Sequence, residues 1–260
     1  MTEPTEYVLP HSMAGEQARL RIMSGLLDPM TRRHLTALGL GPSWSCLEFG
    51  AGNGSVSEWI STQVGPGGRV LCTDLDTTFL DGLRAPNLEV ARLDVVGDPL
   101  PPAEFDLIVG RAVLHHIPAR EQVLARLREA LKPGGWLLSI EPDFTPALTV
   151  DPPAVARLWE GFVAWAATAG IDYFIGRWLP RRIDDLGFAI VGAEATLPHF
   201  NGGSPGGEYW VRSLQEMGPS LVGSGRVQPA DFDAAVATLG DPKRWTYVAA
   251  FTAAWGRWGG

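Results

Sequence analysis

The sequence predicts a single α/β domain built around a doubly wound, mostly parallel sheet. Short apolar runs alternate with helical patterns between residues 45 and 140, which is typical of parallel strands joined by helical crossovers. One run ends in the glycine-rich loop Glu48-Phe-Gly-Ala-Gly-Asn-Gly54, and a helical pattern begins at Ser55. A chain of 260 residues can bury one substantial core, so we expect one domain over residues 1–260.

The charge of the chain argues against several kinds of partner. A formal net charge of −8 and a pI near 5.1 disfavour nucleic acid, which usually requires a basic face. Lys and Arg form no long block, and no apolar run approaches the length of a bilayer, so we expect no membrane partner. The first six residues lack the apolar core of a signal peptide. Cys46 and Cys72, the only cysteines, lie in predicted strands, so we expect reduced thiols and a cytoplasmic protein.

The loop from Glu48 to Gly54 has the properties of a ligand-binding turn. Glycine has no Cβ and tolerates positive φ, so alternating glycines let a ligand approach the backbone. The helix behind the loop directs unpaired N–H groups toward that ligand. A dinucleotide fingerprint placed on Gly50 and Gly52 requires Gly or Ala where this chain has Ser55. The acid before the turn repels a pyrophosphate but suits a ligand that carries an ammonium group.

Four stretches of the chain together resemble the motifs of the class I S-adenosylmethionine (SAM) dependent methyltransferases. In chain order they are Glu48–Gly54, Val70–Asp74, Phe105–Val109 and Leu131–Ile140. More loosely, the chain is similar to the small-molecule methyltransferases of ubiquinone and menaquinone biosynthesis. The resemblance implies a Rossmann-like, seven-stranded sheet in the order 3-2-1-4-5-7-6, with the last strand antiparallel.

The resemblance also divides the domain into three parts. Residues 1–44 form an N-terminal helical cap, 45–143 the SAM-binding half, and 144–260 a wall around the substrate. In the cap we expect two helices, Ala14–Leu27 and Asp28–Leu38. An extension of this kind often lies over the cofactor in the resembled enzymes; the alternative is a helical arm packed outside the sheet.

Acidic residues at strand ends are the main candidates for holding SAM. Asp74 lies 20 residues past Gly54, close to the separation at which an acid meets the ribose hydroxyls; the alternative is a cap for a helix at Thr77–Leu83. The resemblance implies that Asp94 accepts a hydrogen bond from the adenine amino group, the alternative being a turn acid, and that the Arg19 guanidinium binds the SAM carboxylate. The predicted cofactor contacts are Arg19, Glu48, Gly50, Ala51, Gly52, Asp74, Leu75, Asp94, Val95 and Arg111.

Two adjacent histidines, His115 and His116, follow the strand Phe105–Val109. Imidazole titrates near neutral pH, so either ring is a candidate general base; the alternative is a packing role in a short helix. His199 is the third candidate. The segment lacks the Asn/Asp-Pro-Pro-aromatic motif of enzymes that methylate bases or amides, and no zinc spacing occurs. We therefore expect a metal-independent enzyme that does not act on nucleic acid.

Beyond residue 150 the pattern predicts helices, two strands and a flexible loop. The helices span 152–169, 178–186, 209–222 and 229–239, and the strands span 188–196 and 245–255. The loop 197–208 is rich in Gly and is a candidate hinged lid. Frequent aromatic residues suggest an apolar or aromatic substrate. The candidate substrate contacts are Tyr7, His11, Tyr173, Trp178, Phe200 and Tyr209.

The resemblance therefore implies methyl transfer from SAM to an O, N or C atom of a small, apolar or aromatic molecule, with S-adenosylhomocysteine (SAH) as product. Three alternatives stay open. One is an enzyme of the same fold that uses SAM in a cyclisation or decarboxylation, and another is a non-catalytic binding protein. The third is a nicotinamide dehydrogenase, which Glu48 and Ser55 disfavour. For the assembly, a homodimer is one candidate.

Overall fold

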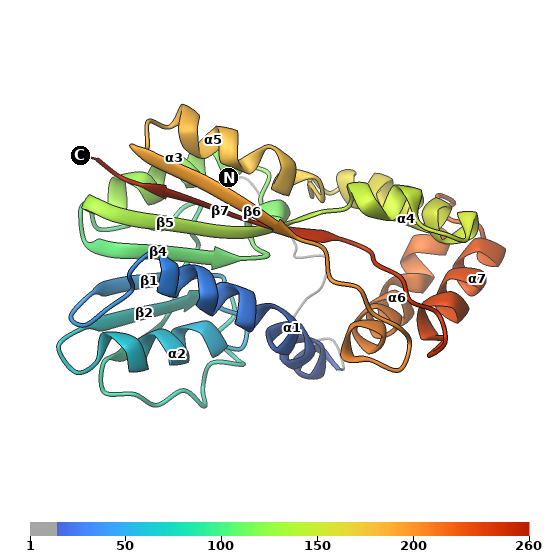
Figure 1. Ribbon diagram of the computed structural model, residues 1–260, viewed down its shortest axis with the longest axis horizontal. Coiled ribbons are helices and arrows are strands. Elements are labelled where there is room, and N and C mark those ends of the chain that lie inside the picture. Colours follow the sequence, from blue (N-terminus) through green and yellow to red (C-terminus); the bar gives the residue numbers. More distant parts are fainter. Residues whose placement is uncertain (1–14, 260) are drawn as a thin grey trace.

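Seven strands form one sheet through the middle of the molecule (Figure 1). The computed structural model describes residues 15–259. The strand order is β3-β2-β1-β4-β5-β7-β6, and β7 runs antiparallel to both neighbours while the other pairs are parallel. This confirms the predicted order and the predicted antiparallel insertion. The strands are β1 (Ser45–Phe49), β2 (Arg69–Asp74), β3 (Leu88–Arg92), β4 (Phe105–Arg111), β5 (Leu131–Asp143), β6 (Ile190–Thr196) and β7 (Ala250–Arg257).

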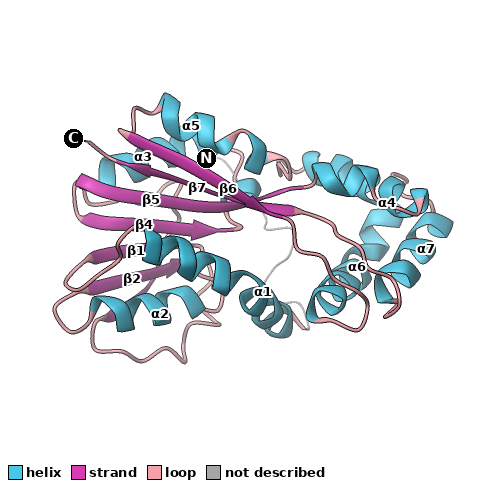
Figure 2. Cartoon of the chain, viewed as in Figure 1, coloured by secondary structure: helices cyan, strands magenta, loops and turns pink. Residues whose placement is uncertain are grey.

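Helices cover both faces of the sheet (Figure 2). The covering helices are α1 (Glu16–Ala37) and α2 (Ser55–Val64) on one face, and α3 (Arg120–Ala130) and α5 (Leu179–Asp185) on the other. Successive side chains of a strand point to opposite faces: Cys46 is buried in the core with α1 and α2, whereas Leu47 is buried in the core with α3 and α5. The near-continuous apolar runs of the central strands follow from this burial on two sides.

Three further helices form a helical layer beyond the carboxyl ends of the parallel strands (Figure 2). They are α4 (Pro153–Ala167), α6 (Pro205–Gly223) and α7 (Pro229–Gly240), and short 3-10 helices occur at η1 (Leu114–His116), η2 (Thr145–Thr149) and η3 (Ile175–Arg177). Trp159, Phe162 and Leu214 are buried in the core of this layer. Open α/β sheets bind ligands outside the carboxyl ends of their strands, so the helical layer stands over the expected ligand crevice.

Helix α1 is continuous, which corrects the prediction of two helices that meet at Asp28. Pro29 lies inside it, where proline removes one backbone hydrogen bond at a cost of about 3 kcal/mol. Leu27 and Leu35 are buried on either side of the proline, and burial of each side chain contributes about 1.5–3 kcal/mol. Packing on both sides therefore offsets the proline and keeps one helix.

Residues 77–83 form turns rather than the predicted helix. The Asp76 carboxylate accepts hydrogen bonds from both the backbone N–H and the hydroxyl of Thr78, at 2.9 and 2.5 Å, and so closes a local turn. Leu80 within this segment is fully buried under the glycine loop. Asp74 therefore caps no helix here.

Two later boundaries also differ from the prediction. The candidate lid 197–208 ends in helix α6, which begins at Pro205 with Ser204 as its N-cap. Only its first part is therefore a loop. Strand β7 begins at Ala250 rather than at 245.

Candidate active site

The glycine loop turns sharply at the carboxyl end of β1. Gly50, Gly52 and Gly54 have φ of 64°, 58° and 73°, in the left-handed region that other residues rarely adopt. A Cβ at Gly50 would lie 2.3 Å from a methyl group of Val113, so the loop packs directly on the segment after β4. The N–H of Ala51 donates to the backbone of β2 at 3.0 Å. The loop thus presents a fixed backbone that carries no side chain at two of its central positions.

Asp74 contacts this loop directly. Its Oδ2 accepts a hydrogen bond from the N–H of Gly52 at 2.8 Å, and Oδ1 accepts one from the N–H of Asp76 at 3.3 Å. The side chain is buried at the end of β2, whereas the next residue, Leu75, is 51% exposed. An ionised carboxylate oxygen can accept more than one hydrogen bond. The predicted ribose acid and the glycine loop therefore belong to one site.

Asp94 closes a turn at the end of β3. Its Oδ1 accepts a hydrogen bond from the N–H of Val96 at 2.9 Å, and its own N–H donates to Asp98 Oδ2 at 2.8 Å. Val95 is buried and packs in the core with α3. The turn role of Asp94 is present in the structure, and its contact with adenine stays a prediction.

Glu48 faces the helix behind the loop. Its Oε2 accepts hydrogen bonds from the backbone N–H and the hydroxyl of Ser57, at 2.8 and 2.5 Å. Burial raises the pKa of Glu48 to about 7, while the Ser57 hydrogen bonds and the charge of Arg111 oppose the rise. A nearby ammonium group would favour the ionised form further, and that pairing stays a prediction.

Buried polar residues attach helix α1 to the glycine loop. Ser24 Oγ donates to Asn53 Oδ1 at 2.9 Å, and Ser55 Oγ donates to Asp28 Oδ1 at 3.0 Å. Arg111, at the end of β4, donates from Nη1 to the same Asp28 oxygen at 2.7 Å and is 7% exposed. The structure therefore gives Arg111 a positioning role between β4 and α1, and its cofactor contact stays a prediction.

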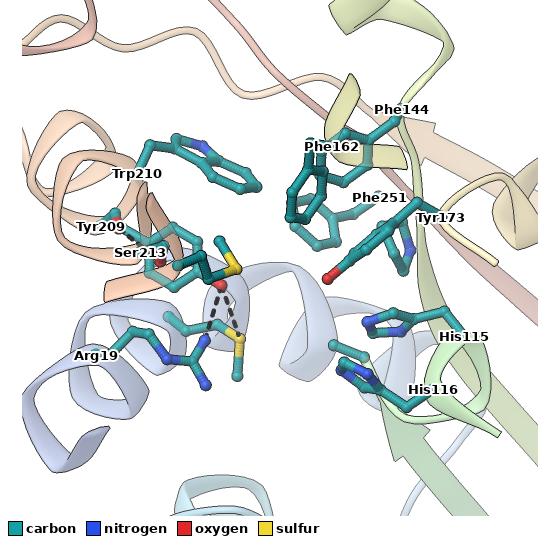
Figure 3. A pocket seen from close by; sticks show the side chains of 14 residues that line it. Arg19, His115, His116, Phe144, Phe162, Tyr173, Tyr209, Trp210, Ser213 and Phe251 are labelled. Atoms are coloured by element: carbon teal, nitrogen blue, oxygen red, sulfur yellow. Dashed lines mark hydrogen bonds between the residues drawn. The ribbon is translucent and has the colours of Figure 1, made fainter. Parts of the chain in front are cut away.

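A cavity of about 60 Å³ lies between α1, α6 and the carboxyl ends of β4 and β5 (Figure 3). Its aromatic walls include Phe144, Phe162, Trp210 and Phe251. Its polar walls are formed by Arg19, His115, His116, Tyr173, Tyr209 and Ser213. Ala112, directly before Val113, also lines it, so the cavity adjoins the glycine loop.

His115 and Glu141 form a buried pair at one wall of the cavity. Nδ1 of His115 lies 2.9 Å from Glu141 Oε2, and the carboxylate also accepts hydrogen bonds from the backbone N–H groups of residues 113, 114 and 115. Burial raises the pKa of Glu141 to about 7, and these backbone donors oppose the rise. Burial lowers the pKa of His115 to about 3, so its ring is neutral at pH 7. Donors around the carboxylate favour its ionised form, which leaves the proton on Nδ1 and a lone pair on Nε2.

The other two histidines differ in position. His116 lies beside His115 with ring centroids 3.8 Å apart, and burial lowers its pKa as well. His199 is exposed, its Nδ1 lies 3.3 Å from the backbone oxygen of Leu197, and its ring packs on Tyr247 with centroids 5.2 Å apart. His199 is not among the described residues that line the cavity, and a catalytic role for it stays a prediction.

Arg19, Tyr173 and Tyr209 are predicted contacts that reach the cavity. Arg19 forms two hydrogen bonds with Glu16, at 2.6 and 2.7 Å, and donates to the hydroxyl of Tyr209 at 3.1 Å. Both members of the ion pair are buried. Arg19 therefore lies at the wall of the cavity with its charge balanced, and its predicted contact with the SAM carboxylate stays a prediction.

Two of the predicted substrate residues lie in hydrophobic cores instead. Trp178 packs in the core with α3 and α5, and its Nε1 donates to Asp172 at 3.0 Å. Phe200 is buried in the core of the helical layer. Neither side chain is among the described residues that line the cavity, so their substrate contacts stay predictions. An aromatic side chain gives the same signal in a sequence whether it fills a core or a cavity. Tyr7 and His11 lie outside the described residues.

Several residues of the site gave little signal in the sequence. Glu141 directly follows the motif Leu131–Ile140, and nothing nearby in the sequence indicated its pairing with a histidine 26 positions earlier. Phe144, Trp210 and Phe251 come from distant segments that only the fold brings together. One available signal was the polar pair Ser24 and Asp28 at four-residue spacing, on the helix face that also carries Leu20.

Two absences apply to residues 15–259. No group of three or more His, Cys, Asp or Glu side chains among them could hold a metal ion. None of the helices in this part of the chain is both long enough and apolar enough to cross a membrane.

Comparison with known proteins agrees with this geometry. Residues 47–137 match a family model described as a methyltransferase domain. The chain is 34% identical over 147 residues to methyltransferase str2 from Strobilurus tenacellus, covering 55% of this chain and 51% of that protein. It is 28% identical over 142 residues to the ubiquinone/menaquinone biosynthesis C-methyltransferase UbiE from Cupriavidus taiwanensis, covering 50% of this chain and 57% of that protein. The chain thus spans about half the length of these curated relatives.

A solved structure with the same fold is Haemonchus contortus phosphoethanolamine N-methyltransferase 2, in complex with phosphomonomethylethanolamine and SAH. It matches with a TM-score of 0.57 at 15% identity, over 93% of this chain and 52% of that chain. The family match begins in β1 and ends in β5, the part of the fold that carries the glycine loop and Asp74. Residues 47–137 therefore match a methyltransferase domain, and the sheet order and motifs are those of the class I SAM-dependent methyltransferases that the chain resembles.

Proposed function

We propose that this chain binds SAM along the glycine loop and transfers the methyl group to an O, N or C atom of a small, apolar or aromatic molecule in the cavity. The observation that carries the proposal is the position of Val113. Its side chain packs on Gly50 of the loop, while Ala112 before it and His115 after it line the cavity. A donor on the loop and an acceptor in the cavity would therefore lie next to each other, as direct transfer requires.

The loop and the strand ends fit the chemistry of SAM. The positive-φ glycines let a ligand touch the backbone, and Asp74 offers an acid to the ribose hydroxyls. Asp94 and the N–H of Val95 are the proposed adenine contacts, with Leu75 as an apolar cover for the ring. Glu48 is the proposed partner of the ammonium group. SAM supplies a methyl group on a positively charged sulfur, which is already a strong electrophile.

The main task of the protein is then to orient two molecules in a dry space. Phe162 and Trp210 give the cavity aromatic walls, and orientation alone can supply on the order of 7–11 kcal/mol of the barrier. An apolar cavity of roughly 150 Å³ is known to bind benzene, whereas this one measures about 60 Å³. An aromatic acceptor therefore requires the walls of the cavity to move apart.

His115 is the proposed base when the acceptor must lose a proton. Its Nδ1–H donates to Glu141, so Nε2 can take a proton from an O–H, an N–H or an acidic C–H while the new bond to carbon forms. The Glu141 carboxylate stabilises the imidazolium that results. The UbiE relatives are named as C-methyltransferases, which supports carbon as one candidate acceptor atom.

Calorimetry with SAH tests the cofactor site. Asp74→Ala should weaken SAH binding by about tenfold or more, because the ribose loses its acceptors. The matched control, Asp81→Ala, removes an exposed acid nearby and should leave the affinity unchanged. Equal affinity of the wild type and Asp74→Ala would refute the ribose assignment. A larger thermal shift with NAD than with SAH would refute the cofactor itself.

Incubation with SAM that carries a labelled methyl group tests the reaction, with hydroxylated and enolisable aromatic compounds as acceptors. Label in the product supports methyl transfer. Conversion without label would favour a cyclisation or decarboxylation, and SAH binding without conversion of any compound would favour a binding protein.

A further inference from the structure

The cavity carries polar groups at two opposite walls. His115 and His116 lie at the wall formed by η1, and Arg19 and Tyr209 lie at the wall formed by α1 and α6 (Figure 3). Aromatic rings from α4, α6 and β7 line the space between them. A molecule that fills the cavity therefore meets a polar group at each end and rings along its length.

The hydroxyl oxygen of Tyr209 has a fixed position. Arg19 Nη1 donates to it at 3.1 Å, and Arg19 is itself held by two hydrogen bonds to Glu16. The Tyr209 ring packs edge-on against Trp210 with centroids 5.0 Å apart. Because the oxygen accepts from Arg19, its own proton must point to a different group.

The proton of Tyr209 has a weak partner. It is directed to Met23 Sδ at 3.8 Å, and a thioether sulfur is a weak acceptor. The neighbouring hydroxyl of Ser213 is already committed, since it donates to the backbone oxygen of Tyr209 at 2.8 Å. An oxygen atom of a bound molecule would be a better acceptor than the sulfur and would replace it.

We propose that Tyr209 donates this hydrogen bond to an oxygen atom of the methyl acceptor. The inference rests on the proposed function and names its substrate class. The acceptor is an uncharged aromatic molecule with one oxygen function at the α6 wall and its nucleophilic group at the His115 wall.

Electrostatics favours the uncharged state of the acceptor. The positive charge of Arg19 is balanced by Glu16, and burial lowers the pKa values of His115 and His116, so both rings are neutral. The described walls thus offer no net positive charge to a carboxylate or a phosphate, and burying an uncompensated charge is costly.

Calorimetry on the SAH-loaded protein tests the proposal. The probes are 2-naphthol and the dihydroxynaphthalenes that carry a second hydroxyl on the other ring. For the wild type, at least one diol should bind about 3- to 10-fold more tightly than 2-naphthol, the range expected for one hydrogen bond. In Tyr209→Phe the ratio should fall to about one, because only the hydroxyl is removed. The control Tyr247→Phe, which removes a hydroxyl away from the cavity beside His199, should keep the preference.

Three outcomes would overturn the proposal: no naphthol or diol binds the SAH-loaded wild type, no diol binds better than 2-naphthol, or Tyr209→Phe keeps the preference. Tighter binding of 2-naphthoate than of 2-naphthol would overturn the uncharged class. These results are distinct from failure of the proposed function. That failure would appear as no binding of SAH, or as no labelled methyl group in any product.

Discussion

Replacing Glu48 with glutamine should remove a pH dependence that this residue gives to folding. The side chain is 3% exposed, and burial raises its pKa from the ordinary 4.5 to about 7. A group with a higher pKa in the folded state binds more protons when folded. Its contribution to stability is therefore complete below pH 4.5 and is lost as the pH rises through 7. The difference between these pKa values corresponds to about 3 kcal/mol.

Urea unfolding of the wild type and Glu48→Gln at pH 5 and pH 8 measures this contribution. Ionisable groups common to both proteins, such as Glu141, cancel in the difference between the two free energies of unfolding. That difference should shift by about 2.5 kcal/mol in favour of the variant between pH 5 and pH 8. The control Glu58→Gln, an exposed acid in the first turn of α2, should show no shift. Parallel pH profiles for the wild type and Glu48→Gln would show that burial does not raise this pKa.

Two further predictions concern the base and the loop. His115→Ala should lower kcat by about 10²- to 10⁴-fold and leave the SAH affinity within twofold, whereas a matching loss of SAH affinity would show that the ring is structural. Gly50→Ala should destabilise the protein by about 2–4 kcal/mol, because a Cβ at φ 64° would clash with Val113. Gly82→Ala, with no atom within 4 Å of the added Cβ, should be nearly neutral in the same thermal unfolding assay, and equal melting temperatures would refute the packing argument.

The sheet and the loop could be predicted because their signals are local. An apolar run and the glycines that follow it are contiguous in the chain. The positive φ at Gly50 is a property of that residue alone and does not depend on a distant partner. The failed helix at 77–83 shows the limit of that reasoning. The same segment has a helical pattern and an aspartate that can close a turn. The Asp76 carboxylate accepts two hydrogen bonds from Thr78, and these stabilise the turn instead of a helix.

Pairing across the fold could not be predicted, because a sequence records residue types without their partners. Arg111 was a reasonable cofactor contact by position, yet it pairs with Asp28, 83 residues earlier. Arg19 and Tyr209 meet across 190 residues. Phe200 and Tyr209 are aromatic residues only nine positions apart, and the sequence does not distinguish them. Phe200 precedes α6 and lies in the core, whereas Tyr209 lies within α6 and lines the cavity.

Helix α1 explains why the glycine loop and the cavity form one unit. Leu20, Ser24 and Asp28 follow at four-residue spacing and share one face of the helix. That face contacts the loop, because a Cβ at Gly52 would lie 3.4 Å from Leu20. Ser24 forms a hydrogen bond with a side chain of the loop, and Asp28 forms one with the first side chain of α2. Arg19 and Met23 each precede a member of this set by one position, about 100° around the helix, and line the cavity. A rigid helix with these two adjacent faces cannot shift against the loop without also changing the cavity wall.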